Sequence, residues 1–254
     1  MSSLMVDTYT HAGVTVTLRQ DPTPEHADPR DADNLSEMFV SYRGYSLGDH
    51  QLPAAGLPSI SCPSCEGEGS EGGYACERCE GAGEVEPTLP EWFASEAAIA
   101  AMPLFVHEHG GISISGGRLV MLEDDEVKSK DTSSSSRFPL DAAGWDTSFV
   151  GFMISTEANI ERLCGSARSY RDPGWLAEAF KSELAEYDRF LRGEVFGYIV
   201  AEGSTFEDSC WGFIGLDHAR REANSAAEIV AEELGAEESE RLAWAARDVE
   251  TVEV

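Results

Sequence analysis

Four cysteines in the first third of the sequence have a type and spacing that indicate chemistry. They form two Cys-x-x-Cys pairs, Cys62 with Cys65 and Cys76 with Cys79, and ten residues separate the inner cysteines. Four thiolates at this spacing can close a tetrahedral site on a hairpin-like loop, and zinc is the metal that prefers such a site. The sequence therefore predicts a zinc knuckle with one structural zinc ion and these four cysteines as ligands.

The two pairs belong to an internal repeat with a period of fourteen residues. Each pair is followed by Glu-Gly-x-Gly, which ends at Gly69 in the first repeat and at Gly83 in the second. Glycine permits the tight turns that aim backbone N–H groups at cysteine sulfurs. The repeated Cys-x-x-Cys-x-Gly-x-Gly motif resembles the cysteine-rich domain of the DnaJ chaperone family. The resemblance covers about residues 62–85, and its two repeats imply one zinc ion but no chaperone activity, since the sequence contains no His-Pro-Asp loop of a J-domain.

The ligand set and the neighbouring residues restrict the possible roles of the zinc ion. A site closed by four cysteines leaves no position open for water or substrate, which argues against catalysis. The segment from Cys62 through Glu96 contains nine acidic residues and one base, Arg78, so the module is a poor candidate for a nucleic-acid-binding finger. A contact with another protein is the better interpretation. The remaining cysteines, Cys164 and Cys210, are predicted to be small buried hydrophobic residues.

A second arrangement of polar residues offers an alternative site. His107 and His109 project from the same face of a predicted strand, and Asp146 or Glu108 could complete a metal or catalytic site. Apolar residues across the following turn favour the interpretation that these histidines are structural. The sequence contains no nucleophile elbow, phosphate loop, dinucleotide fingerprint or His-Glu-x-x-His helix. An enzyme of unfamiliar type is therefore the alternative rather than the main interpretation.

The composition restricts the class of partner. The formal net charge is −29, from 47 acidic and 18 basic residues, and only three of the bases are lysines. Such a surface repels phosphate, so direct binding to nucleic acid or to an anionic membrane is disfavoured. Three explanations of the acidity stay open: adaptation to high salt inside a halophile's cell, mimicry of nucleic acid toward a basic partner, and solubility.

The length of 254 residues suggests one domain with a small module, or two modest domains. The sequence has no apolar run of about 20 residues, which a membrane helix needs. Its start lacks the features of a secretory signal, so a cytoplasmic location is expected. The pattern divides the chain into residues 1–58, which we expect to join the main domain, the zinc knuckle at 59–87, and a main domain at 88–254.

Periodicity predicts the elements of the main domain. Alternating apolar residues predict strands at 13–20, 104–109, 112–115, 118–122, 149–155, 195–200 and 210–215. Apolar residues at steps of three and four predict helices at 34–42, from 89, at 173–191 and from 217. Asp172-Pro173 is a typical helix start and Gly193 a typical end. The fold class is therefore α+β, a mostly antiparallel sheet packed by two or more helices.

The main domain also carries a resemblance of its own. Its Asp208-Ser-Cys-Trp-Gly-Phe213 string and three further segments are similar to a group of small uncharacterised proteins of tailed phages and mobile elements. The further segments are residues 103–115, 145–152 and 186–200. The resemblance implies an accessory protein of a virus, provirus or plasmid, acting inside the host cell, and it implies no activity.

These observations together predict an acidic, zinc-stapled accessory protein that binds a macromolecule, most plausibly a protein. A narrower hypothesis is mimicry of nucleic acid against a host nuclease or defence factor. The acidic stretches at 123–126 and 228–240 are the candidate mimics. The sequence predicts neither the identity of the partner nor the oligomeric state.

Overall fold

The computed structural model describes residues 4–53, 56–108, 111–122, 147–165, 172–202 and 205–250. The chain divides into two compact units, Met1–Asp28 with Arg189–Val254, and Pro29–Asp188. We call them unit 1 and unit 2. The predicted α+β class is confirmed, with strands that are mostly antiparallel. The division differs from the predicted one, because the two ends of the chain form a unit together and residues 88–254 are shared between both units.

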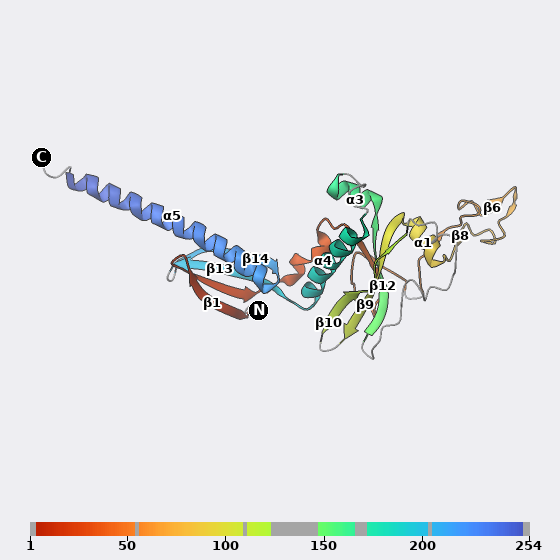
Figure 1. Ribbon diagram of the computed structural model, residues 1–254, viewed down its shortest axis with the longest axis horizontal. Coiled ribbons are helices and arrows are strands. Elements are labelled where there is room, and N and C mark those ends of the chain that lie inside the picture. Colours follow the sequence, from red (N-terminus) through yellow and green to blue (C-terminus); the bar gives the residue numbers. More distant parts are fainter. Residues whose placement is uncertain are drawn as a thin grey trace. The chain divides into compact units, whose positions relative to one another are not determined.

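Unit 1 is a four-stranded antiparallel sheet with one long helix on one face (Figure 1). The strand order is β1-β2-β13-β14, with bounds Met5–His11, Val14–Gln20, Val195–Glu202 and Thr205–Ile214. Helix α5, Leu216–Glu250, follows directly. Alternate residues of β2 and β13 are buried because they face α5, and alanines on the helix allow a close approach. This core consists of Val14, Val16, Leu18, Tyr198, Val200, Ala219, Ala223, Ala226, Ala227 and Val230.

Unit 2 contains a six-stranded sheet. Five of its strands have the order β10-β9-β12-β3-β4, and the sixth, β11, also pairs with β9. All pairs are antiparallel except β3 with β4. The strand bounds are Glu37–Val40 (β3), His50–Gln51 (β4), Ala98–Glu108 (β9), Ile112–Gly116 (β10), Val120–Met121 (β11) and Thr147–Thr156 (β12). The predicted pairing of the strands on either side of Gly110-Gly111 is confirmed by β9 and β10.

Helices cover both faces of this sheet. Helix α1, Leu89–Ser95, places Trp92 and Phe93 against Phe39 and Phe152 in an aromatic cluster. Helix α4, Pro173–Leu191, packs on the other face, where Leu184 lies close to Gly116. Helix α3, Glu157–Cys164, follows β12 and is capped by the Thr156 side chain. The predicted helix at 173–191 therefore matches α4 at both ends.

A buried ion cluster fixes α4 to the start of β3. The Arg30 side chain is only 4% exposed and donates to both carboxylate oxygens of Asp49, at 3.1 and 2.5 Å. Glu183 on α4 lies 3.5 Å from the same guanidinium and accepts from the backbone N–H of Leu35 and the hydroxyl of Ser36. Removing one partner would leave an uncompensated buried charge and would therefore be strongly destabilising.

Two predictions are wrong. Residues 34–42, predicted as a helix, contain strand β3 instead, in which Met38, Phe39 and Val40 are all buried because both faces of the sheet are covered. A strand buried on both faces is a continuous apolar run, which has no period that distinguishes it from a helix. Cys210, predicted to be buried, is exposed, and Cys164 is half-buried.

Candidate metal centre

The four predicted cysteine ligands converge in unit 2. Their sulfurs all lie within 4.8 Å of one another. The Sγ atoms of Cys62 and Cys76 are 3.9 Å apart, and those of Cys65 and Cys79 are 3.7 Å apart. A tetrahedron with metal–sulfur bonds of about 2.3 Å has sulfur–sulfur edges of about 3.8 Å. The two measured separations match such edges, and the four side chains are compatible with binding one metal ion.

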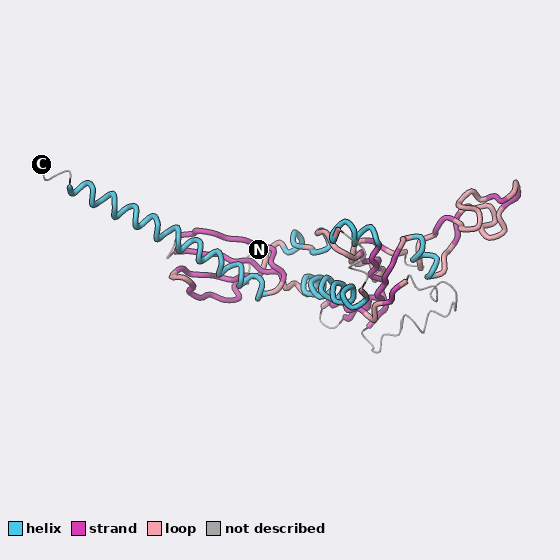
Figure 2. Tube along the Cα trace, turned by 45° about the horizontal axis from the view of Figure 1, so that its top comes forward, coloured by secondary structure: helices cyan, strands magenta, loops and turns pink. Residues whose placement is uncertain are grey.

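The two repeats build this site by bonding to each other. The N–H of Cys62 donates to the carbonyl of Gly83 at 2.8 Å, and the N–H of Cys76 donates to the carbonyl of Gly69 at 2.9 Å. Each first cysteine thus bonds to the last glycine of the other repeat. Four short strands complete the module, with β5 paired to β8 and β6 paired to β7. They are Ile60–Ser61, Ser70–Glu71, Tyr74–Ala75 and Glu84–Val85 in chain order, and Figure 2 shows that loop predominates between them.

The last glycine of each repeat is required by space as well as by backbone conformation. Gly69 and Gly83 have φ values of +70° and +79°. A Cβ atom at Gly69 would lie 2.5 Å from the carbonyl oxygen of Gly81, and one at Gly83 would lie 2.5 Å from that of Gly67. No side chain fits at either position. The glycines that the sequence linked to tight turns therefore also let the two repeats approach closely.

Backbone N–H groups support negative charge on some of the sulfurs. Burial raises the pKa of the Cys62 thiol, but hydrogen bonds from the N–H groups of Ser64 and Cys65, together with those of the Cys65 and Cys76 side chains, bring that pKa down to about 7. The pKa of Cys79 is also lowered, against burial, by the N–H groups of Gly83 and Gly81. Burial, helped by the neighbouring sulfurs, raises the pKa of Cys65 to about 11. Four adjacent thiols cannot all ionise alone, and a bound cation removes that obstacle.

The module has almost no apolar core of its own. Its buried cluster consists of the four cysteines, with only Val85 packed beside them. Seven glutamates are exposed around this cluster, namely Glu66, Glu68, Glu71, Glu77, Glu80, Glu84 and Glu86. The single base, Arg78, donates to Glu91 of α1 at 2.5 Å, and this ion pair holds the pKa of Glu91 below its usual range. A metal ion would therefore supply the cohesion that apolar side chains supply elsewhere.

Tyr74 is an exposed residue of the module that was not predicted as a candidate site residue. This residue is 81% exposed in β7, directly after the Gly72-Gly73 turn that joins it to β6. Both glycines have positive φ, +59° and +87°, as the two-residue hairpin turn requires. The glycine pair before an aromatic residue is the sequence signal that could have located it. The hairpin thus presents one large aromatic side chain among carboxylates.

The alternative site is described only in part. His107 has both ring nitrogens in hydrogen bonds, Nδ1 at 2.8 Å from Thr147 Oγ1 and Nε2 at 2.7 Å from Ser115 Oγ. A metal would have to displace one of these partners. His109 and Asp146 lie outside the described residues. Within the described part of the chain, the cysteine cluster is the one group of three or more potential ligands close enough to hold a metal ion.

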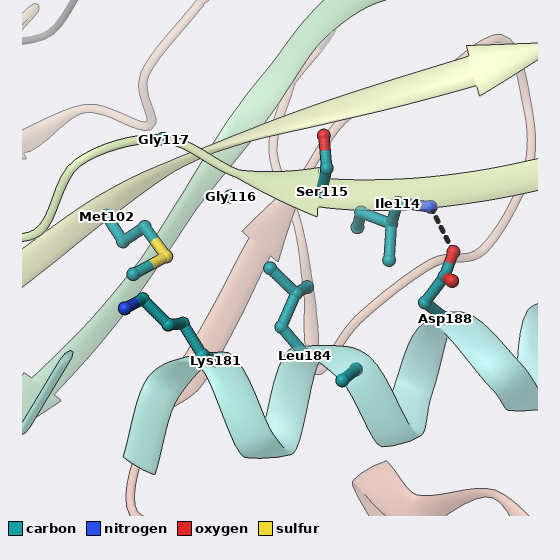
Figure 3. A pocket seen from close by; sticks show the side chains of 9 residues that line it. Met102, Ile114, Ser115, Gly116, Gly117, Lys181, Leu184 and Asp188 are labelled. Carbon is teal, nitrogen blue, oxygen red and sulfur yellow. Dashed lines mark hydrogen bonds between the residues drawn. The ribbon is translucent and has the colours of Figure 1, made fainter. Parts of the chain in front are cut away.

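A pocket of about 290 Å³ lies between β10 and α4 (Figure 3). Met102, Ile114 and Leu184 give it an apolar lining. The charged side chains at its border have partners within the chain. Asp188 accepts from the N–H of Ile114 at 2.9 Å, and Lys181 donates to Glu178 at 2.7 Å. The pocket therefore offers packing surface but no convergent set of polar groups.

Fold and site together define an α+β protein with a closed cluster of four cysteines that is suited to a metal ion. Comparison of the chain with protein-family models, with curated proteins and with solved structures gives no match. The resemblances to DnaJ cysteine-rich domains and to mobile-element proteins therefore stay predictions. None of the described helices is both long and apolar enough to cross a membrane.

Proposed function

We propose that this protein binds a basic protein partner through the acidic lobe that residues 59–87 form around a zinc ion. The observation that carries the proposal is the distribution of side chains in this lobe. Its cysteines are buried, and its seven glutamates and Tyr74 are exposed to solvent. A module whose residues face water almost throughout presents a surface rather than encloses a substrate.

Zinc is the metal that the ligands favour. Four thiolates in a tetrahedron are typical of structural zinc, and the sulfur separations match its bond length. Iron is the main competitor for such a ligand set, and copper(I) binds thiolates as well. Metal analysis of the purified full-length protein tests this part. We expect one zinc ion per chain.

Charge determines the class of partner. Seven exposed glutamates and the dianionic zinc–thiolate centre face one arginine, Arg78, which is itself paired to Glu91. Such a lobe attracts a surface rich in lysine and arginine and accelerates the encounter with it. Tyr74 adds an aromatic anchor of the kind that dominates binding energy in protein interfaces. The partner we expect is a protein with a basic surface around an apolar depression.

A matched pair of variants tests the proposal in the full-length protein. The probe is a fluorescent peptide rich in lysine and arginine that contains one phenylalanine, and binding is followed by fluorescence anisotropy. One variant changes Glu66, Glu68, Glu80 and Glu84 to Gln. The control changes Glu222, Glu228, Glu232 and Glu233 of α5 to Gln, which alters the net charge equally. We expect the first variant to bind more weakly than the control, and equal losses would refute a role specific to the lobe.

Mimicry of nucleic acid is a narrower form of the same proposal. Of the candidate mimics, residues 123–126 lie outside the described part of the chain, while Glu228, Glu232 and Glu233 are exposed on α5. Carboxylates four residues apart on a helix repeat about every 6 Å along its axis. One DNA strand carries a phosphate about every 3.4 Å. A single row of carboxylates on α5 is thus more widely spaced than the phosphates of one DNA strand. Mimicry predicts that duplex DNA displaces the protein from its basic partner.

A further inference from the structure

The sheet of unit 1 ends in two edge strands, β1 and β14, that differ in how they are protected. Strand β14 contains two bulges, seen as register shifts opposite 196–198 and 200–201, and helix η1, Pro24–Ala27, packs against it. Bulges and covering segments are the usual means of blocking an edge. Strand β1 has one bulge, at Val6, and its remaining residues, 7–11, are regular. No strand pairs with the outer side of β1 among the described residues.

The hairpin turn determines which backbone groups of β1 point outward. His11 and Val14 flank the two-residue turn Ala12-Gly13, and residues in that position bond to each other through both N–H groups. Asp7, Tyr9 and His11 therefore bond to β2. Thr8 and Thr10 alternate with them, so their N–H and C=O groups face the open side. The regular part of β1 thus offers four backbone groups to a further strand.

The same edge begins with three consecutive exposed apolar residues. Leu4 is 69% exposed, Met5 is 61% exposed and Val6 is 40% exposed. Such a run beside an unpaired strand is a strong template for pairing with another chain. The open backbone and the apolar run therefore indicate an interface at β1.

We propose that β1 pairs in antiparallel fashion with β1 of a second copy of this chain, with the two-fold axis at Tyr9. This register uses all five regular residues and brings Thr8 opposite the partner's Thr10. It also brings Asp7 opposite the partner's His11, so that the strand is complementary to itself. An axis at Thr8 would draw the bulged Val6 into the ladder, and an axis at Asp7 would oppose two carboxylates. The two sheets join into one of eight strands.

The register also covers the apolar run. Continuing the pairing past Asp7 places Val6 and Met5 beside the partner's Ala12-Gly13 turn, where they are removed from water. The contacts from β1 to α5 stay in place on their own face of the sheet, with Tyr9 donating to Asn224 at 2.7 Å and Arg220 to Asp7 at 2.7 Å. The pairing therefore needs no change within unit 1.

The effect of salt distinguishes dimerisation through β1 from the proposed binding of a basic partner. Two copies of net charge −29 repel each other, and salt screens that repulsion. The proportion of dimer should therefore rise with sodium chloride concentration. Binding of a basic partner to the acidic lobe should weaken with the same change. The dimer rests on unit 1 alone and does not depend on the proposed function.

Sedimentation of the full-length protein over a concentration series gives the first test. We expect a monomer–dimer equilibrium that strengthens with salt. Val6→Lys should weaken the association about tenfold, since it places an unpaired charge at the contact. Ser209→Lys, on β14, changes the net charge equally and should leave the association unchanged. A chain that stays monomeric at all concentrations, or equal effects of both variants, would overturn the proposal.

Disulfide trapping tests the register without relying on a destabilising variant. The background is Cys210→Ser, which removes an exposed thiol. Paired residues that exchange hydrogen bonds have Cα atoms about 5.5 Å apart, within the range of a disulfide. Thr8→Cys mixed with Thr10→Cys should therefore form a disulfide-linked dimer under oxidation. Either variant alone should not, and equal crosslinking of Thr8→Cys with itself would overturn the register.

Discussion

The knuckle of residues 59–87 and unit 1 obtain their cohesion in opposite ways. Unit 1 buries a continuous apolar core between a sheet and α5, with Val16 and Leu18 fully buried. The knuckle buries its four cysteines with Val85 beside them. Apolar burial accumulates over many residues and tolerates single losses, whereas a metal site depends on every ligand at once. Two regions of this chain should therefore differ in the change that unfolds each of them.

Loss of one ligand should produce the largest effect. Cys76→Ser should reduce metal content from one ion per chain to nearly none, because structural zinc sites contribute about 10–16 kcal/mol that requires the full ligand set. Hydrogen exchange should then show unprotected amides in residues 59–87 and unchanged protection in unit 1. Cys210→Ser is the matched control and should retain the metal. Unfolding of unit 1 in the first variant would contradict the comparison.

A core variant should give the reverse pattern. Leu18→Ala removes a fully buried side chain from the core of unit 1 and should reduce the free energy of unfolding by about 2–5 kcal/mol. Urea denaturation measures this loss. The metal content should stay at one ion per chain, and a loss of metal would show that the two regions are coupled.

Two glycine variants separate crowding from backbone strain. Gly69→Ala should weaken metal binding by about tenfold or more, because its Cβ would meet the carbonyl oxygen of Gly81. Gly72→Ala is the control, since Gly72 also has positive φ but no atom lies within 4 Å of a Cβ there. Competition with a chromogenic chelator measures both affinities. An equal loss in the two variants would attribute the effect to strain alone.

The ion pair between the knuckle and α1 should contribute least. Arg78→Ala should reduce the stability of the α1 segment only slightly, since both side chains are partly exposed. Arg78 lowers the pKa of Glu91, so the stabilisation is complete above the usual glutamate pKa of 4.5 and is lost as pH falls through the lower folded value. Amide exchange of α1 should differ between variant and wild type at pH 7 and converge in acid.

The sequence predicted elements well where one face is buried and poorly where two are. Strand β2 alternates and helix α4 steps by three and four residues, so both were predicted at nearly their observed bounds. Strand β3 is buried on both faces and was mistaken for a helix. The ligand cysteines were found because their spacing is local. The partners of Arg30, which are Asp49 and the distant Glu183, depend on tertiary packing that no local pattern records.

The exchange of hydrogen bonds between the two repeats has a consequence for how such a module can arise. Each Cys-x-x-Cys-x-Gly-x-Gly segment bonds to the other through Cys62 with Gly83 and Cys76 with Gly69. One repeat alone therefore lacks its hydrogen-bond partners and cannot form a smaller version of the module. An ancestral chain that carried one segment could complete the site only by pairing with a second molecule, and tandem duplication would turn that encounter into a property of a single polypeptide.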